Sequence, residues 1–249
     1  MMVKIGNIVS RLAFAALLAG QVSVGQAAGK TAGGKITVVG FGDSITEAAT
    51  QMPDESKRWL KILDQKLTEA LPACRFSVIN SGIGGNSARE AMGRLDRDVI
   101  AHNPDYVILE FGGNNNDPNH PARRVPPTEF KGLLERFKTA VAPKTKIIVV
   151  TFPPVIREWH AYWNNPRSRE YLEKSDAEMG LERYVALTRE FATKNKYPVF
   201  DLHQVLADLG KANGREQYTL PDGVHLTEAG NEVLAEGVFN ILKTIIEDK

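Results

Sequence analysis

Short apolar runs alternate along the chain with longer segments in which apolar residues recur at helical spacing. The short runs are nearly continuous in apolar residues, as strands buried on both faces are, and span residues 36–41, 75–79, 106–111, 146–152 and 199–202. Helical spacing occupies about 56–71, 87–101, 126–140, 175–195 and 227–246. This alternation predicts βαβ units, and therefore a parallel sheet with helices on both of its faces.

Polar, glycine-rich segments follow the first three predicted strands, and one more precedes the last predicted helix. They read GDSIT at 42–46, NSGIGGN at 80–86, GGNN at 112–115 and DGVH at 222–225. Ligands of parallel sheets bind beyond the carboxyl ends of the strands. We therefore expect these four segments, far apart in the sequence, to meet in one site.

Two of these segments contain the three side chains that serine hydrolysis requires. Ser44 would be the nucleophile, His225 the base that takes its proton, and Asp222 the carboxylate that orients the imidazole. Each residue also has a structural interpretation: a helix-capping serine, a surface-loop histidine, and the aspartate of a Pro-Asp-Gly turn. The combination favours catalysis. A Gly-x-Ser-x-Gly elbow does not surround the serine, so the α/β-hydrolase pattern is absent.

With these blocks in this order, the chain resembles the SGNH or GDSL hydrolases over nearly all of residues 36–246. The resemblance implies a flavodoxin-like, three-layer α/β/α sandwich around a five-stranded parallel sheet. It also implies hydrolysis of carboxylic esters. Gly85 and Asn114 match the oxyanion glycine and asparagine of the family, and the backbone N–H of Ser44 would be the third donor.

One position departs from the family pattern. The third block of the family usually ends in Asp, whereas this chain has Asn115. Either Asp117 makes the hydrogen bonds of the usual Asp, or no residue does. Asp43, beside the candidate nucleophile, is interpreted as a residue that caps backbone N–H groups in its own turn.

Residues 153–171 form an unusually long and aromatic connection after the fourth predicted strand. Long loops in compact domains are often functional. Trp159, Tyr162 and Trp163 would suit a wall that faces a carbohydrate, because aromatic rings offer apolar area beside polar neighbours. An aromatic plug packed on the domain fits the same residues equally well.

The N-terminus has the pattern of a signal peptide over residues 1–28, which leaves one hydrolase domain at 29–249. Lys4 and Arg11 come before an apolar stretch at 12–19, and small residues follow it, with a cleavage site at Ala27 or Ala28. The stretch is too short for a membrane anchor, which takes roughly 20 residues. We expect a secreted or periplasmic protein without stable membrane insertion after cleavage.

Charge and composition exclude several other classes of function. The formal net charge of +1 gives no field that favours nucleic acid. Cys74 is the single cysteine, lies in LPACRF without a nearby histidine, and is interpreted as a buried structural residue. No cluster of His, Cys and Asp has the spacing of metal ligands, so neither a metal nor another cofactor is expected.

The sequence therefore predicts a serine esterase that acts on a small-molecule or glycan ester. Export and the aromatic segment favour removal of acetyl groups from a sugar or glycan. The first alternative is a lipase or lysophospholipase-like acylesterase, which would need a sizeable apolar groove. The second is a non-catalytic carbohydrate-binding descendant, against which the full set of candidate catalytic residues argues.

Overall fold

The sheet has five strands, all parallel, in the order β2-β1-β3-β4-β5. The computed structural model describes residues 34–141 and 143–248. The strands are β1 (Lys35–Gly42), β2 (Arg75–Gly82), β3 (Tyr106–Glu110), β4 (Lys146–Val150) and β5 (Val199–Phe200). This order is that of flavodoxin-like folds, and it confirms the predicted sheet.

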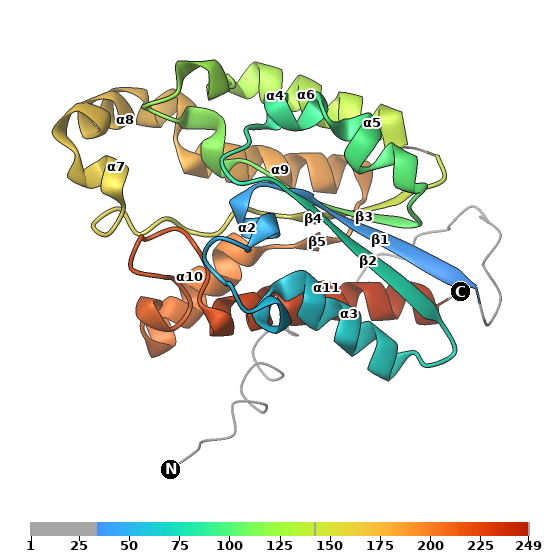
Figure 1. Cartoon of the computed structure of the whole chain (residues 1–249). Helices are drawn as coiled ribbons and strands as arrows, with labels where there is room; N and C mark the ends of the chain where they lie inside the picture. Colours follow the sequence, from blue (N-terminus) through green and yellow to red (C-terminus); the bar gives the residue numbers. More distant parts are fainter. Residues whose placement is uncertain (1–33, 142, 249) are drawn as a thin grey trace, which may run out of the picture.

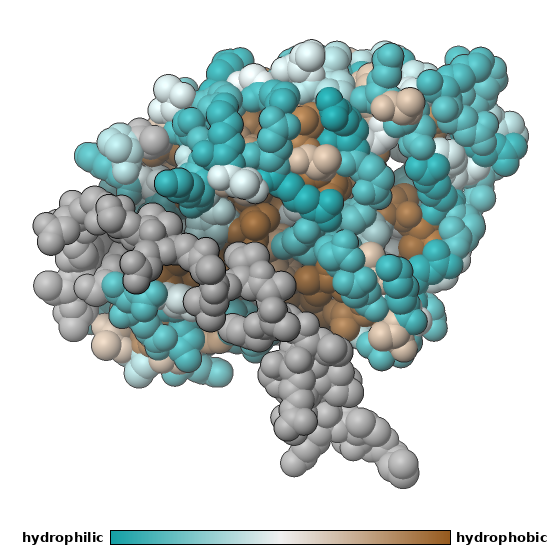
Figure 2. Space-filling view, turned by 180° about the vertical axis from the view of Figure 1, so that it is seen from behind, coloured by the Kyte–Doolittle hydropathy of each residue, from teal (hydrophilic) through white to brown (hydrophobic). Residues whose placement is uncertain are grey.

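Helices cover both faces of the sheet, which makes the three layers that the sequence predicts (Figure 1). One layer contains α4 (Ala88–Met92), α5 (Leu95–Asp98), α6 (Pro127–Val141) and α9 (Leu181–Asn195). The other contains α3 (Trp59–Ala70), α10 (Leu202–Asn213) and α11 (Glu228–Glu247). Figure 2 shows the molecule from behind, where hydrophilic residues cover most of the visible surface and apolar residues show between them.

Two hydrophobic cores lie on opposite faces of the sheet because side chains alternate along each strand. In β1, Val39 and Phe41 belong to the core under α4, α6 and α9, whereas Val38 belongs to the core over α3 and α11. In β3, Leu109 belongs to the first of these cores and Ile108 to the second. Cys74, half-buried, packs against the second core just before β2 begins. It therefore lies at the opposite end of the sheet from Ser44.

Shorter elements form the connections, many of them at the carboxyl ends of the strands. They are α2 (Ser44–Glu47), α7 (Ala161–Asn164), and the 3-10 helices η2 (Glu55–Lys57), η3 (Ile100–His102), η4 (Gly113–Asn116), η5 (Pro121–Arg123) and η6 (Arg215–Gln217). The helix predicted over 87–101 is divided into α4, α5 and η3. None of the helices in the described ranges is both long enough and apolar enough to cross a bilayer.

The connection after β4 differs most from the sequence prediction. Residues 153–171 are not one long loop, because α7 is followed by α8 (Pro166–Met179). Asn165 caps α8 through its side-chain oxygen, and Pro166 takes the first helical position, where its missing N–H costs nothing. The helix predicted over 175–195 is instead two helices. They meet at Gly180, where a side chain would collide with the carbonyl of Asp176.

The signal-peptide prediction for residues 1–28 lies outside the described residues, as does most of residues 29–35, the lead-in to the domain.

Candidate active site

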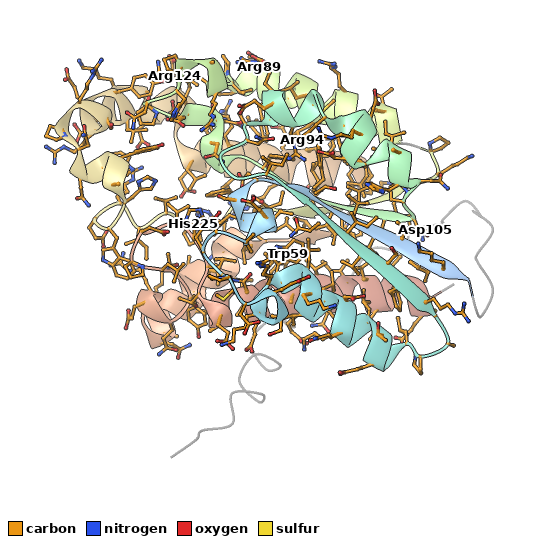
Figure 3. The ribbon with its side chains drawn as sticks, viewed as in Figure 1. Trp59, Arg89, Arg94, Asp105, Arg124 and His225 are labelled. Atoms are coloured by element: carbon orange, nitrogen blue, oxygen red, sulfur yellow. The ribbon has the colours of Figure 1, made fainter. Side chains whose placement is uncertain are left out.

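The structure brings Ser44, His225 and Asp222 into one hydrogen-bonded chain. Ser44 is the first residue of α2, directly beyond the carboxyl end of β1, and His225 lies in the loop before α11 (Figure 3). The Nε2 atom of His225 is 2.9 Å from Oγ of Ser44, and its Nδ1 atom is 2.8 Å from Oδ2 of Asp222. A carboxylate accepts only, so Nδ1 carries the proton and Nε2 is left to accept one from the serine.

Asp222 is held as a carboxylate by its own turn. Its Oδ1 atom accepts hydrogen bonds from the backbone N–H groups of Val224 and His225, both at 2.9 Å. Burial on its own would raise the pKa of Asp222, but these two N–H groups and the imidazole outweigh it and hold the pKa below its usual range. Asp222 therefore fulfils both interpretations: Oδ1 closes the turn, and Oδ2 accepts the hydrogen bond of the imidazole.

The candidate oxyanion residues lie on the loops that follow β2 and β3. Gly85 and Asn114 line the same cavity as Ser44. Gly85 has a φ of 75°, which favours glycine, and an added Cβ would come within 3.0 Å of the Arg123 guanidinium. Among the described residues, no acceptor takes the backbone N–H of Gly85 or of Ser44. Both donors are open to a substrate oxygen.

The Asn114 amide already has two acceptors. Its Nδ2 atom donates to Oδ2 of Asp43 at 3.0 Å and to the backbone carbonyl of Asn86 at 3.3 Å. The first bond fixes the direction of the amide. The second is longer and therefore weaker, so it is the one that a developing oxyanion could displace.

Asn115 accepts a hydrogen bond from the backbone N–H of Ala88, which the oxygen of the usual aspartate could accept equally well. It is fully buried, and its Oδ1 atom accepts the backbone N–H of Ala88 at 3.0 Å, which satisfies the first turn of α4. Its Nδ2 atom has no acceptor in the described part of the chain. Asp117 does not take this place, because its carboxylate bonds Asn119 and His120 of its own loop.

A second carboxyl group, which none of the sequence motifs indicates, lies beside Asp43. Glu110, the last residue of β3, is 1 % exposed, and its Oε2 atom accepts a hydrogen bond from Oγ1 of Thr46 at 3.0 Å. Burial raises the pKa of Glu110 well above its usual range, and the charge of Asp43 adds to this; burial also raises the pKa of Asp43, to about 7. An acidic residue within the apolar run YVILEF was the available signal.

Arg94 links the ends of β1 and β2, where two of the active-site loops begin. Its side chain is nearly buried and donates to the carbonyls of Gly42 at 2.8 Å and Ser81 at 2.6 Å. It also donates to Oδ1 of Asn86 at 2.7 Å. One guanidinium therefore fixes the loop after β1 relative to the loop after β2. Sequence spacing alone did not single it out.

The cavity in front of Ser44 has a volume of about 740 Å³. Tyr162 and Trp163 line it, in keeping with the first of the two interpretations of the aromatic segment. The Arg157 guanidinium lies 4.2 Å from the Trp163 ring and pairs with Asp176 of α8 at 2.9 Å. The ion pair with Asp176 fixes the Arg157 guanidinium, which in turn holds the Trp163 ring in place.

Trp159 is placed differently from these two rings. It is not among the described residues that line the cavity. Its ring lies 5.5 Å from the guanidinium of Arg215, which belongs to η6, and the residue itself is part of the turn at Ile156–His160. The aromatic segment is thus divided between the two interpretations: two rings face the cavity and one packs on the domain.

Metal ligation has no candidate in the described ranges, where no group of three or more His, Cys, Asp or Glu side chains is close enough to hold an ion.

Similarity to known proteins agrees with this geometry. The model of the GDSL-like Lipase/Acylhydrolase family matches residues 41–233. The uncharacterized lipoprotein YqeF of Bacillus subtilis is 26% identical over 220 residues, which are 81% of this chain and 87% of that protein. Esterase TesA of Pseudomonas aeruginosa is 24% identical over 213 residues, 84% of this chain and 89% of that one.

Solved structures share the fold. The acetylxylan esterase Axe2 of Geobacillus stearothermophilus superposes with a TM-score of 0.64 at 21% identity, over 85% of this chain and 95% of that one.

Proposed function

This chain belongs to the GDSL-like lipase/acylhydrolase family and is a carboxylic ester hydrolase, and from this premise we propose that it removes acetyl groups from sugars or glycans. Ser44, His225 and Asp222 are the proposed catalytic triad. The observation that carries the proposal is the hydrogen-bonded chain Asp222–His225–Ser44, which opens onto a cavity with an aromatic wall.

The proposed reaction has two acyl-transfer steps. The Ser44 oxygen attacks the ester carbonyl while Nε2 of His225 takes the serine proton, and Asp222 stabilises the imidazolium that forms. The C–O bond to the alcohol then breaks, and His225 gives that proton to the leaving oxygen. Water, activated by the same imidazole, attacks the acyl-enzyme and releases the acid and free Ser44.

The oxyanion would be held by the N–H groups of Ser44 and Gly85 and by the amide of Asn114. Each such donor typically lowers the barrier by about 3 kcal/mol. The Asn114 amide would exchange its 3.3 Å bond to Asn86 for the oxyanion and keep its bond to Asp43. That exchange favours the transition state over the ground state, where a carbonyl oxygen accepts more weakly.

A sugar or glycan fits the cavity in size and in chemistry. A volume of about 740 Å³ far exceeds an acetyl group, so most of the space is available to the alcohol. The rings of Tyr162 and Trp163 can stack on sugar C–H surfaces, and Glu47 and Arg123, which also line the cavity, can bond hydroxyl groups. The name of Axe2 describes the same substrate chemistry for that neighbour.

A longer acyl chain is the second candidate, because several apolar side chains line the cavity. They are Leu172, Met179 and Leu181, from α8 and α9, together with Val155 and Phe152. Apolar lining of this kind supports the groove that a lipase or lysophospholipase-like acylesterase would need. A non-catalytic descendant is disfavoured, because such a protein has no need for the 2.9 Å contact between His225 and Ser44.

A substrate panel tests the proposal. Acetylated xylo-oligosaccharides would be compared with chromogenic esters from acetate to palmitate, using the wild type and Ser44→Ala. We expect kcat/KM to be highest for the saccharide and to fall as the acyl chain lengthens. Faster hydrolysis of long-chain esters would favour the second candidate. Hydrolysis that survives Ser44→Ala would exclude Ser44 as the nucleophile.

We also propose that the enzyme is exported from the cell. The charged, apolar and small-residue pattern over residues 1–28 supports a cleaved signal and a secreted or periplasmic enzyme. YqeF is named a lipoprotein, but in this chain the single cysteine, Cys74, lies within the hydrolase domain, far from the N-terminal apolar stretch. N-terminal sequencing of the exported protein should give a start near residue 28. An intact N-terminus in the membrane fraction would contradict this.

A further inference from the structure

Two buried carboxylic acids lie directly behind the candidate nucleophile. Asp43 is fully buried in the turn between β1 and α2, and Glu110 is buried at the end of β3. The strands pair so that Phe41 lies opposite Leu109, which brings the residues that follow to the same level of the sheet. The two carboxyl groups are consequently within hydrogen-bonding reach of each other.

The hydrogen bonds of this pair balance only if one proton is present. Both oxygens of Asp43 accept: Oδ1 from the backbone N–H of Ile45 and Oδ2 from the Asn114 amide, each at 3.0 Å. Oε2 of Glu110 accepts from Thr46, and the backbone N–H of Asp43 also acts on this carboxyl group, but Oε1 makes no hydrogen bond among the described residues. An ionised, buried oxygen without a donor is costly, and two adjacent buried charges are more so.

A proton on Glu110 resolves both difficulties. It turns the unsatisfied oxygen into a donor, and Asp43 is the acceptor within reach. It also leaves one negative charge in the pair, on Asp43, and the positive charge of Arg94 acts on that carboxylate. A second negative charge would oppose the oxyanion that forms next to Asn114.

We propose that Glu110 is a positioning residue that works as a neutral acid: it donates to Asp43 and fixes the carboxylate that orients the Asn114 amide. The same carboxylate holds the N–H of Ile45, and with it the first turn of α2, on which Ser44 lies. The inference rests on the proposed function, because the direction of the Asn114 amide matters only if an oxyanion forms beside Ser44.

Two substitutions at one position separate a neutral acid from a carboxylate. Glu110→Gln keeps a neutral donor and an acceptor, so we expect kcat within about threefold of wild type. Glu110→Leu has similar volume but no donor, so kcat should fall by about tenfold to a hundredfold with KM nearly unchanged, because the oxyanion contact belongs to the transition state. Equal losses in both variants, or no loss in Glu110→Leu, would overturn the proposal.

Controls separate positioning from general destabilisation. Val149→Ala opens a cavity in the same sheet, on the side of the other core, and should lower Tm without lowering kcat. If Glu110→Leu does not fold, an infrared measurement decides. The carbonyl band of a protonated carboxylic acid should be present in the wild type near pH 7 and absent in Glu110→Gln, and a wild type without that band would contradict the proposal.

The outcomes also distinguish this inference from the proposed function. If the wild type hydrolyses esters and Ser44→Ala does not, the proposed function stands whatever the Glu110 variants do. If hydrolysis is absent or independent of Ser44, the proposed function fails, while the infrared band still reports whether Glu110 is protonated.

Discussion

Nε2 of His225 lies 2.9 Å from Oγ of Ser44, although 181 positions separate the two residues in the sequence. The contact arises because α2 begins where β1 ends and because the loop before α11 returns to the same edge of the sheet. Asp222, three residues before the histidine, holds the far side of the imidazole.

Asp222→Asn should abolish most activity while the protein stays folded. The amide can no longer stabilise the imidazolium, and it can favour the tautomer with the proton on Nε2, which cannot accept from Ser44. We expect kcat to fall by about a thousandfold or more. Circular dichroism and steady-state kinetics test this, and a loss below about tenfold would remove Asp222 from the triad.

Asn114→Ala should lower kcat and kcat/KM together, by about a hundredfold. The amide is expected to bind the oxyanion more strongly than the carbonyl of the bound substrate. Steady-state kinetics on one acetate ester provide the measurement. A rise in KM with unchanged kcat would show instead that Asn114 only holds the substrate.

Asn115→Ala should destabilise the fold rather than impair chemistry directly. The substitution leaves the N–H of Ala88 without its acceptor at 3.0 Å and opens a small cavity. We expect a loss of about 1–3 kcal/mol in the free energy of unfolding. Denaturant titration measures it, with Asn240→Ala on the exposed surface of α11 as a control. Unchanged stability would show that the bond contributes nothing.

Trp163→Ala and Trp159→Ala form a matched pair for the aromatic segment. Trp163 lines the cavity, whereas Trp159 packs against Arg215. Trp163→Ala should lower kcat/KM for an acetylated saccharide much more than for a small chromogenic acetate. Trp159→Ala should affect both substrates equally and lower Tm. Equal losses on both substrates for Trp163→Ala would assign this ring to packing.

Stability should respond to pH through Glu110. Burial and the charge of Asp43 beside it keep the pKa of Glu110 above its usual range, so the folded chain holds a proton that the unfolded chain releases above about pH 4.3. The stability of the wild type therefore has a contribution that falls as the pH rises through this window. Glutamine does not titrate, so the Tm of Glu110→Gln relative to wild type should rise between about pH 5 and about pH 8. A constant difference would mean that Glu110 is ionised in the fold.

The sequence was informative where apolar runs meet polar residues, and much less so elsewhere. Continuous apolar runs located the strands, and the loops after β1, β2 and β3 follow from the rule that ligands bind at strand ends. Helix α8 was missed because it has one buried residue, Ser168, and hence little apolar periodicity. The sequence feature that indicates the start of this helix is the N-cap residue Asn165 followed by Pro166.

Tertiary partners explain the remaining differences. Glu110 occurs in an apolar strand, and only the fold shows that its neighbour is Asp43. Trp159 and Trp163 are four residues apart in one aromatic cluster, yet the turn at Ile156–His160 sends them to different surroundings. Sequence spacing cannot give such directions in irregular segments.

The small buried area of α8 has an evolutionary consequence. Residues that support the active-site loops, such as Arg94 and Asn115, are buried and hydrogen-bonded to backbone groups of other segments, so most changes there would disturb the fold. The wall contributed by α7 and α8 is largely exposed, and changes there affect the core little. Selection can therefore alter which alcohol or acyl group the cavity accepts while the machinery that cleaves the ester remains the same.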